Sequence, residues 1–364
     1  MTVKTWVRGV VCGGVISCLA GCSGAAFDQQ DDGQGGITPG PTGSEAPEVL
    51  TEPRWTVAPG LSDRRCDASV SLLADGRALV TGGRDPAWSK TAWTTADLFD
   101  PATDTWKSVA PMLADRSGHL QITLGDGRVL VAGGAETIAH PKGRVLELAE
   151  IFDPGAAGGA GEWFPTAPLP VPMSQVSGVL LADGRVLAVS PMGAALFDPS
   201  REAWENVSPP KAMSSARRLD DGRVLALHSG GEALLFDPAA KTWEAVEALT
   251  SPDGAMYARF LSSDGEPLVL ANERLLAFDL ATKSWVERET LAEAPANFGV
   301  TTHYGTYVPA RRLHRAPDAK AVELPELPAT PCGDHGITLR DGRLLLPGPE
   351  ATLLLELPQT EQTE

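Results

Sequence analysis

The sequence lacks the residue groupings that mark most catalytic and metal sites. Its six histidines show no His-x-x-x-His spacing and no Cys-x-x-Cys pair occurs, although metal ligands often fall at such spacings. No Gly-x-Ser-x-Gly motif marks a nucleophile, and tyrosine, with three residues, is scarce. We therefore expect a protein that is not an enzyme and that holds no metal and no cofactor.

Positive charge is also in short supply. The chain has 30 lysines and arginines against 47 aspartates and glutamates, which gives a net charge of −17. A chain this acidic is repelled by nucleic acid and by anionic lipid, so the composition argues against both as electrostatic partners. The simplest role of the excess negative charge is solubility.

The apolar stretch at residues 10–20 is too short to span a bilayer. It follows Lys4 and Arg8 and ends just before Cys22, an order that predicts a signal peptide over residues 1–21. The four residues Leu19-Ala-Gly-Cys22 resemble the bacterial lipobox. The resemblance implies cleavage before Cys22 and lipidation of its thiol, with palmitate as a typical acyl chain.

Two interpretations of Cys22 remain open, and both export the protein. A lipidated Cys22 would anchor it to a membrane of the bacterial cell envelope, which we expect to be the outer membrane, on the periplasmic or the exposed side. Otherwise Cys22 follows an ordinary secretory signal by chance. Residues 22–50 are rich in glycine, proline and acidic residues, which cannot offset the entropy lost on ordering, so we expect a flexible linker.

Residues 51–357 contain a recurring phrase. Its first whole copy joins two apolar runs through Asp75-Gly76, which predicts a hairpin because such a turn matches the twist of the flanking strands. Phe99-Asp-Pro101 then predicts a turn, and Trp106 opens another strand. One copy is therefore expected to form a four-stranded antiparallel sheet.

The copies follow one another at intervals that are typical of propeller blades. Repeats of about 40 to 50 residues with four strands each predict an all-β fold, a β-propeller whose blades bury their faces against their neighbours. The recurring elements are Asp-Gly-Arg at Asp75, Asp126, Asp183, Asp221 and Asp341, Phe-Asp-Pro at Phe99, Phe152, Phe197 and Phe236, and a closing tryptophan at Trp106, Trp163, Trp204, Trp243 and Trp285.

The spacing of the hairpins predicts seven blades. Asp264, in an Asp-Gly-Glu variant, and Asp341 are 77 residues apart, about twice the 38 residues that separate the hairpins of blades three and four. A degenerate blade at residues 294–328 would fill that interval.

The last blade needs a fourth strand, because after residue 357 we expect only a disordered tail, residues 358–364. Residues 52–59 have the form of that strand, so we expect an N-terminal strand to close the ring.

Two glycine doublets, Gly82-Gly83 and Gly133-Gly134, follow the second strands of blades one and two. With the closing tryptophans, these doublets resemble the kelch-repeat family over most of residues 51–357. The resemblance implies a kelch-type propeller and says little about activity. The doublets fade in later blades, which have Ser190-Pro191 and Pro347-Gly348 instead.

Some kelch-like propellers are copper radical oxidases that resemble galactose oxidase, and these need tyrosines, histidines and a cysteine joined to a tyrosine. Here the tyrosines are Tyr257, Tyr304 and Tyr307, and His303-Tyr304, in the most degenerate blade, is the nearest approach to a ligand pair. The oxidase is therefore the weaker expectation.

The two remaining cysteines of the mature chain, Cys66 and Cys332, occupy equivalent positions. Each stands nine residues before the aspartate of its hairpin, Asp75 or Asp341. If the ring closes, the two positions lie on neighbouring blades at the same end of the central channel. In an oxidising compartment we predict a disulfide between them, the alternative being two free buried thiols.

Arg65, Arg116 and Lys211 stand one position before the equivalents of Cys66 in their blades. Three cations near one channel mouth could bind an anionic ligand. The alternative is that they pair with nearby carboxylates or are solvated at the rim.

Two loops between second and third strands are long, residues 84–95 and 135–144. Trp88 and Trp93 in the first and His140 and Arg144 in the second are candidate binding residues, because variable loops on a rigid scaffold commonly carry function and aromatics dominate interface energy. The alternative for the tryptophans is that they fold back and cap blade one.

These patterns favour a membrane-tethered, extracytoplasmic, monomeric binding module whose long-loop face engages a protein or glycan of the envelope. The alternative is a cryptic enzyme, of oxidase or lyase type, with a site at the channel mouth near Arg65, Arg116 and Lys211. A third possibility is a structural protein of the envelope.

Overall fold

The computed structural model describes residues 50–85, 92–136, 144–250, 258–260, 267–290, 336–348 and 350–358, with Pro325, Pro328 and the backbone of the strands between 300 and 323. Cys22, Trp88, His140 and Cys332 lie outside the described residues, as do the expected signal peptide and most of the linker. The chain divides into two units, Met1–Glu48 and Val49–Glu364. In the described part, no helix is long and apolar enough to cross a bilayer.

The second unit is built from four-stranded antiparallel sheets. The first four are β2 (Ser69–Leu72), β3 (Ala78–Thr81), β4 (Ala96–Asp100), β5 (Thr105–Ser108); β6 (Leu120–Thr123), β7 (Val129–Ala132), β8 (Ala149–Asp153), β9 (Glu162–Thr166); β10 (Ser177–Leu180), β11 (Val186–Ser190), β12 (Gly193–Asp198), β13 (Ala203–Asn206); and β14 (Ser215–Arg218), β15 (Val224–Leu227), β16 (Ala233–Asp237), β17 (Thr242–Ala245). A short helix, α1 (Ala156–Gly159), lies between β8 and β9.

Three further sheets follow along the chain. They are β18 (Ala258–Phe260), β19 (Leu268–Ala271), β20 (Arg274–Asp279), β21 (Ser284–Thr290); β22 (Val300–Thr302), β23 (Gly305–Val308), β24 (Arg312–His314), β25 (Val322–Glu323); and β26 (Ile337–Thr338), β27 (Leu344–Leu346), β28 (Ala351–Glu356), which pair with β1 (Arg54–Pro59). The β22–β25 sheet coincides with the expected degenerate blade, but only its backbone is described. The structure therefore describes six blades together with their side chains.

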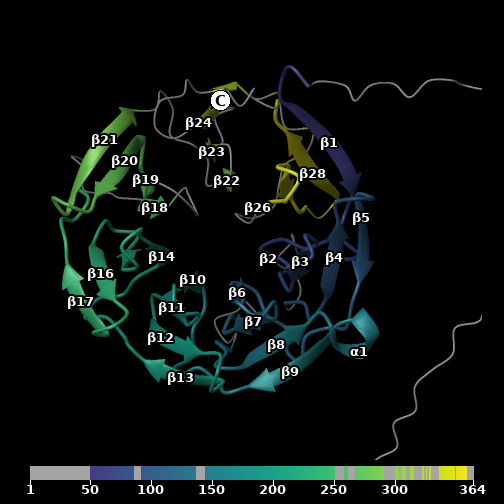
Figure 1. Ribbon diagram of the computed structural model, residues 1–364, viewed down its shortest axis with the longest axis horizontal. Helices are drawn as coiled ribbons and strands as arrows, with labels where there is room; N and C mark the ends of the chain where they lie inside the picture. The colour runs from purple at the N-terminus through teal and green to yellow at the C-terminus, as the bar shows by residue number, and fades with distance from the viewer. Residues whose placement is uncertain are drawn as a thin grey trace, which may run out of the picture. The chain divides into compact units, whose positions relative to one another are not determined.

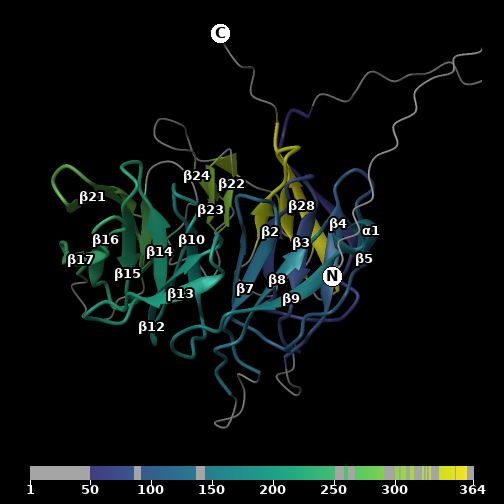
Figure 2. The same ribbon diagram turned by 60° about the horizontal axis from the view of Figure 1, so that its bottom comes forward.

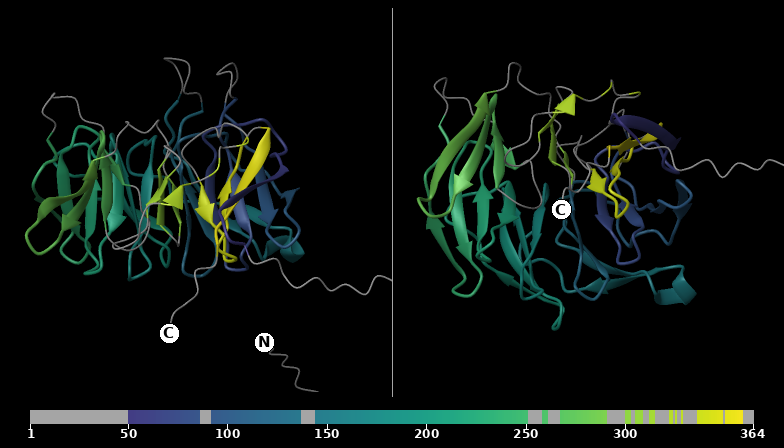
Figure 3. Two further views of the ribbon diagram at one scale, coloured as in Figure 1. Left: turned by 90° about the horizontal axis from the view of Figure 1, so that it is seen from above. Right: turned by 45° about the horizontal axis from the view of Figure 1, so that its top comes forward.

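The sheets succeed one another around a common centre, with their first strands innermost and their fourth strands outermost (Figure 1). First strands of successive sheets contact each other, as β2 does β6 and β26 does β2. Figures 2 and 3 show the strands running between two opposite faces of this unit. The fold is therefore an all-β β-propeller.

The Asp-Gly-Arg turns join first and second strands, as expected. In the first of them Gly76 has a φ of +92°, and Asp75 accepts hydrogen bonds from the backbone N–H of Arg77 at 3.0 Å and from its Nε at 2.8 Å. The same two bonds recur at Asp126, Asp183, Asp221 and Asp341. The repeated motif thus encodes a turn with its own side-chain lock.

Several hairpin arginines also reach the next sheet. Arg128 Nη1 donates to Glu202 at 2.9 Å and Arg185 Nη2 to the carbonyl of Pro238 at 2.9 Å, both in turns between third and fourth strands. Arg343, in the last sheet, donates to the carbonyl of Pro101 at 2.6 Å in the first. The motif therefore joins blades as well as strands.

The closing tryptophans perform two tasks. Each packs on the phenylalanine of the Phe-Asp-Pro or Phe-Asp-Leu turn with ring centroids 4.7 to 5.0 Å apart, four of them at a tilt and Trp285 edge-on. The indole N–H of several also donates to a carbonyl at the end of the preceding sheet, as Trp163 does to Ala110 at 2.7 Å and Trp106 to Pro59 at 3.0 Å. Tryptophan is needed because it combines a large apolar ring with a donor.

β1 takes the fourth position in the sheet of β26, β27 and β28. It pairs antiparallel with β28 from Arg54 opposite Glu356 to Pro59 opposite Ala351. Its Trp55 donates to the carbonyl of Pro325 at 3.2 Å, just past β25, which repeats the link made by the other tryptophans.

The glycine doublets lie where neighbouring blades approach most closely. Gly82 and Gly83 have φ of +59° and +98°, and the N–H of Gly83 donates to the carbonyl of Arg116 in the next blade at 2.9 Å. A Cβ on Gly82 would lie 2.3 Å from that carbonyl oxygen. Gly133 and Gly134 repeat the arrangement against Met173. The doublet is therefore required by both backbone conformation and contact.

We expect Gly82→Ala to destabilise the propeller by more than about 3 kcal/mol, because it combines a left-handed φ with a backbone clash. Gly184→Ala has a φ of +86° but no atom within 4 Å of the new Cβ, and should cost about 1 to 2 kcal/mol. Gly125→Ala meets neither problem and should be nearly neutral. Urea unfolding of the three variants checks this order, and equal losses for Gly82→Ala and Gly184→Ala would contradict it.

Candidate functional site

The loops between second and third strands and the connections from fourth to first strands lie at one end of the sheets, which we call the loop face. The two long loops on this face begin as extensions of their sheets. Arg84 bridges to Cys66 and to Ala92, and Ala135 bridges to Ser117 and to Val145. Isolated antiparallel bridges thus connect the bases of both loops to their sheets beyond the ends of the strands.

The bases of the two loops are also joined to each other. The N–H of Ala92 donates to the carbonyl of Glu136 at 2.8 Å, which links the loop of blade one to that of blade two. The backbone of Trp93 contributes to the same region, because its N–H donates to Gly83 at 2.9 Å and its carbonyl accepts from Arg116 at 3.2 Å. Its indole is half-buried. The described bases of the two loops therefore form one hydrogen-bonded stretch of backbone. We call the backbone of Gly83, Ala92, Trp93, Arg116 and Glu136 the platform.

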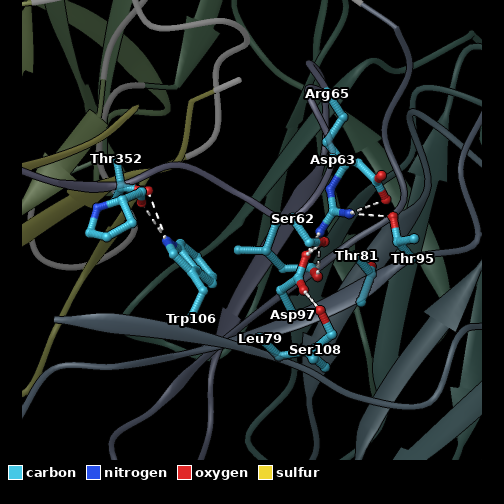
Figure 4. Close-up of polar contacts among 12 residues, drawn as sticks. Ser62, Asp63, Arg65, Leu79, Thr81, Thr95, Asp97, Trp106, Ser108 and Thr352 are labelled. Carbon is cyan, nitrogen blue, oxygen red and sulfur yellow. Dashed lines mark hydrogen bonds and ion pairs between the residues drawn. The ribbon is translucent and has the colours of Figure 1, made fainter. Parts of the chain in front are cut away.

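Arg65 lies beneath this platform in a buried ion pair (Figure 4). Its Nη2 is 2.6 Å from Oδ2 of Asp97 on β4, and both side chains are 0% exposed. Ser62 and Ser108 donate to the same carboxylate at 2.8 and 2.7 Å. Arg65 also donates to the hydroxyl of Thr95. The Asp97 carboxylate and both Nη groups of Arg65 are hydrogen-bonded, as burial requires, whereas the buried Nε of Arg65 has no partner among the described residues.

Arg116 repeats the arrangement in blade two. Its Nη2 donates to Glu150 Oε1 on β8 at 2.7 Å, and its Nη1 to the carbonyls of Gly133 at 2.7 Å and Leu148 at 2.9 Å. The second oxygen of Glu150 accepts the N–H of Leu113 at 2.7 Å. The two side chains of the pair are 1% exposed.

These contacts bear on the two interpretations of Arg65 and Arg116, an anion site or pairing with nearby carboxylates. Both guanidiniums are enclosed and matched by carboxylates, which is the alternative that the sequence left open. Burial lowers the pKa of each guanidinium, and the partner carboxylate opposes that shift. Lys211 differs, because its exposed ammonium lies 3.7 Å from Oε1 of Glu232.

The two carboxylate partners have a sequence signal of their own, which the repeated turn and tryptophan motifs do not include. Asp97 and Glu150 stand two residues before Phe99 and Phe152, within otherwise apolar strands. Blades one and two, which have these acids, also have an arginine ten residues before the aspartate of the hairpin. Blade three has Met173 and Ala195 at the corresponding positions, both buried.

We expect Arg116→Met to cost about 3 to 5 kcal/mol of unfolding free energy, because it leaves the Glu150 carboxylate buried without its partner. The double variant Arg116→Met with Glu150→Ala copies blade three and should recover part of that loss. Chemical denaturation of both variants tests this, and a double variant no more stable than the single one would contradict it.

The other candidate residues lie at different places on the loop face. Cys66, 1% exposed, is disulfide-bonded, whereas its expected partner, Cys332, lies outside the described residues. Arg144 is exposed and donates to Glu136 at 2.8 Å. Trp93 and Arg144 therefore lie at the bases of the two long loops. Lys211 lies elsewhere on the loop face, in the connection that leads into β14 of blade four.

Histidines of the described region take part in local pairs. His119 is buried between blades one and two, with its Nε2 2.9 Å from the hydroxyl of Thr81. His228 lies with its Nδ1 3.0 Å from Oε2 of Glu232 on the surface of blade four. In the part of the chain that the structure describes, no group of three or more histidine, cysteine, aspartate or glutamate residues could hold a metal ion. The pair His303-Tyr304 lies outside that part.

No protein-family model matches the chain, and the search of curated proteins finds no match. Among solved structures, the fold is similar to that of a fungal alcohol oxidase of the AA5 family in complex with copper, with a TM-score of 0.63 and 11% identity over 85% of this chain and 77% of that one. A streptogramin B lyase is similar with a TM-score of 0.61 and 11% identity, over 85% of this chain and 99% of that one. At this identity the likeness shows the propeller fold and no activity.

Proposed function

We propose that the protein is a membrane-tethered, extracytoplasmic kelch-repeat lipoprotein that binds a protein or a glycan through its loop face. The observation that carries this proposal is the shared platform under the two long loops, in which Ala92 and Glu136 join the loop bases. A rigid base holds a binding loop in place at a low entropic cost, so affinity depends on the loop residues themselves.

The proposal includes a ring of seven blades, with the β22–β25 sheet as the sixth along the chain and β1 closing the seventh. The pairing of β1 with β28 and the bond from Trp55 to Pro325 support it. The close approach of blades at the two glycine doublets supports the kelch type. A closed ring leaves no sheet edge exposed for aggregation.

Lipidation at Cys22, after removal of residues 1–21, would tether the propeller to a membrane of the bacterial envelope. Residues 22–50 would then act as a flexible linker that lets a monomeric propeller reach an envelope partner. The net charge of −17 favours such a partner over nucleic acid. We propose no cofactor for this role.

A disulfide between Cys66 and Cys332 would staple the first and last blades. It would close most of the propeller into one covalent loop, for which unfolded-state entropy suggests a stabilisation of about 5 to 6 kcal/mol. The disulfide bond of Cys66 and its burial support the pairing.

Trp88→Ala tests the binding role. Trp93 is half-buried and its backbone forms part of the platform, so Trp88 is the better variant for separating binding from folding. Full-length protein in liposomes is incubated with solubilised envelope proteins and, separately, with a glycan array. We expect Trp88→Ala to reduce capture by about tenfold or more, as loss of an interface aromatic commonly does, with an unchanged Tm.

Two controls accompany this variant. Phe164→Ala removes a partly exposed aromatic from β9, away from the loop face, and should leave capture unchanged. Cys22→Ser should release the protein from the membrane fraction without altering capture by the soluble form. Unaltered capture by Trp88→Ala, or a large fall in its Tm, would contradict the proposal.

A second candidate is an enzyme of oxidase or lyase type with its site at the channel mouth. It is compatible with the structural neighbours, one of which is an alcohol oxidase in complex with copper and the other a lyase. Among the residues proposed for this site, Arg65 and Arg116 are buried in ion pairs, which leaves Lys211 as an exposed cation.

Metal analysis with a count of free thiols separates the two candidates. Residues 51–364 are purified under oxidising conditions, and their metal content and thiols are measured by mass spectrometry. A binding module with a Cys66–Cys332 disulfide should contain no stoichiometric metal and no free thiol. Stoichiometric copper with a reactive cysteine would overturn the disulfide and move the function to oxidase chemistry.

A further inference from the structure

Apolar side chains are exposed on the loop face of blades two and three. Of the six large hydrophobic residues that are exposed in the described part of the chain, three lie here: Leu113 (60%), Leu148 (42%) and Met192 (50%). Leu113 belongs to the connection between β5 and β6, Leu148 directly precedes β8, and Met192 belongs to the turn between β11 and β12. All three connections open on the same end of the sheets. We call these three residues the apolar patch.

The patch is connected through the buried ion pair of blade two. The N–H of Leu113 donates to Glu150 at 2.7 Å, and the carbonyl of Leu148 accepts from Arg116 at 2.9 Å. The two leucines therefore flank one Arg–Glu pair, which fixes their backbones. Ser174 has its hydroxyl 4.0 Å from the sulfur of Met192. The preceding residue, Met173, donates its N–H to the carbonyl of Leu146, two residues before Leu148, at 3.1 Å.

Blade one shows what these positions look like without an apolar patch. Ser62 stands three residues before Arg65 as Leu113 does before Arg116, and Thr95 stands two before Asp97 as Leu148 does before Glu150. The hydroxyls of Ser62 and Thr95 bond directly to the ion pair.

In blade two, backbone groups make the corresponding bonds, and both leucine side chains are left in contact with solvent. The fold therefore does not need leucine at either position. Exposed apolar groups that lie together on one face commonly mark interaction surfaces.

The charges beside the patch are mainly negative. Glu147 is exposed next to Leu148, while Asp115 is half-buried two residues after Leu113. The pKa of Asp115 is raised, first by its burial and then by the nearby carboxylate of Glu136. Arg144 pairs with Glu136 at 2.8 Å, and Arg116 is cancelled by Glu150. The described side chains around the patch therefore leave an excess of carboxylates.

We propose that the apolar patch docks a protein segment that carries apolar side chains next to lysine or arginine. Leucine and methionine offer a sugar neither stacking faces nor hydrogen bonds, which disfavours a glycan at this spot. The surrounding carboxylates attract a basic segment and repel an anionic lipid surface. This inference rests on the proposed function, a loop face that binds a partner, and it defines the chemistry of that partner.

Fluorescence anisotropy with a labelled leucine–lysine peptide tests the inference on the full chain in detergent. A peptide with glutamate in place of lysine and vesicles that contain phosphatidylglycerol serve as comparison probes. We expect the leucine–lysine peptide to bind, with an affinity that falls as salt rises, and the other two probes to bind at least about tenfold more weakly.

The decisive variant, Leu113→Ser with Leu148→Thr, copies blade one and changes no charge. We expect it to weaken peptide binding by about tenfold or more while Tm stays the same or rises, and Met192→Ser, a second variant, to weaken it less. Val57→Thr with Val286→Thr removes apolar groups that are 59% and 39% exposed on the outer strands β1 and β21, and should leave binding unchanged.

Equal affinity in the wild type and both patch variants would overturn the inference, because binding would then depend on charge alone. So would failure of the wild type to bind the peptide, or a preference for the vesicles or the acidic peptide. If patch variants bind normally and Trp88→Ala does not, the loop face binds its partner elsewhere and the proposed function survives. If no loop-face variant alters any binding, both proposals fail.

Discussion

Close approach between neighbouring blades is the constraint on which the rest of this structure depends. A single sheet of four short strands cannot bury its own faces, so each blade must pack against the next, and at the two glycine doublets the backbones themselves come within hydrogen-bonding distance. The bond from Gly83 to the carbonyl of Arg116 makes that contact, and a side chain on Gly82 would block it. The hairpin arginines also bond to the neighbouring blade, at the end of the sheets opposite the loop face. The closing tryptophans bond to the neighbouring blade from the fourth, outermost strands.

The buried ion pair of blade two connects this contact between blades to the loop face. Arg116 receives the backbone contact from the preceding blade through its carbonyl, while its guanidinium binds Glu150 and the carbonyls of Gly133 and Leu148. One residue thus connects two blades, the ion pair and the base of a long loop. Removing either charge exposes the other to an apolar surrounding, so the pair specifies its geometry more than it adds net stability.

The fold alone leaves the function open, because propellers of similar structure include an alcohol oxidase and a lyase, each at 11% identity. What distinguishes this chain is how equivalent positions differ between blades. Ser62 and Thr95 serve the ion pair with their side chains, whereas Leu113 and Leu148 serve it with their backbones. The side chains of Ser62 and Thr95 are therefore used by the fold, whereas those of Leu113 and Leu148 remain available for a partner.

The all-β fold and its strand order were readable from the sequence, because Asp-Gly turns, Phe-Asp-Pro turns and tryptophans act locally and repeat. The identity of the carboxylates that pair with Arg65 and Arg116 was not predicted, although two acids within apolar strands are a signal for them. Their partners, Asp97 and Glu150, are more than 30 residues away in the chain, and only strand pairing brings them within 2.7 Å. The exposure of Leu113 and Leu148 was likewise decided by tertiary structure, since a leucine's sequence neighbours do not tell whether packing will cover it. Local turn chemistry is written in adjacent residues, whereas pairing of charges and burial depend on which distant segments meet.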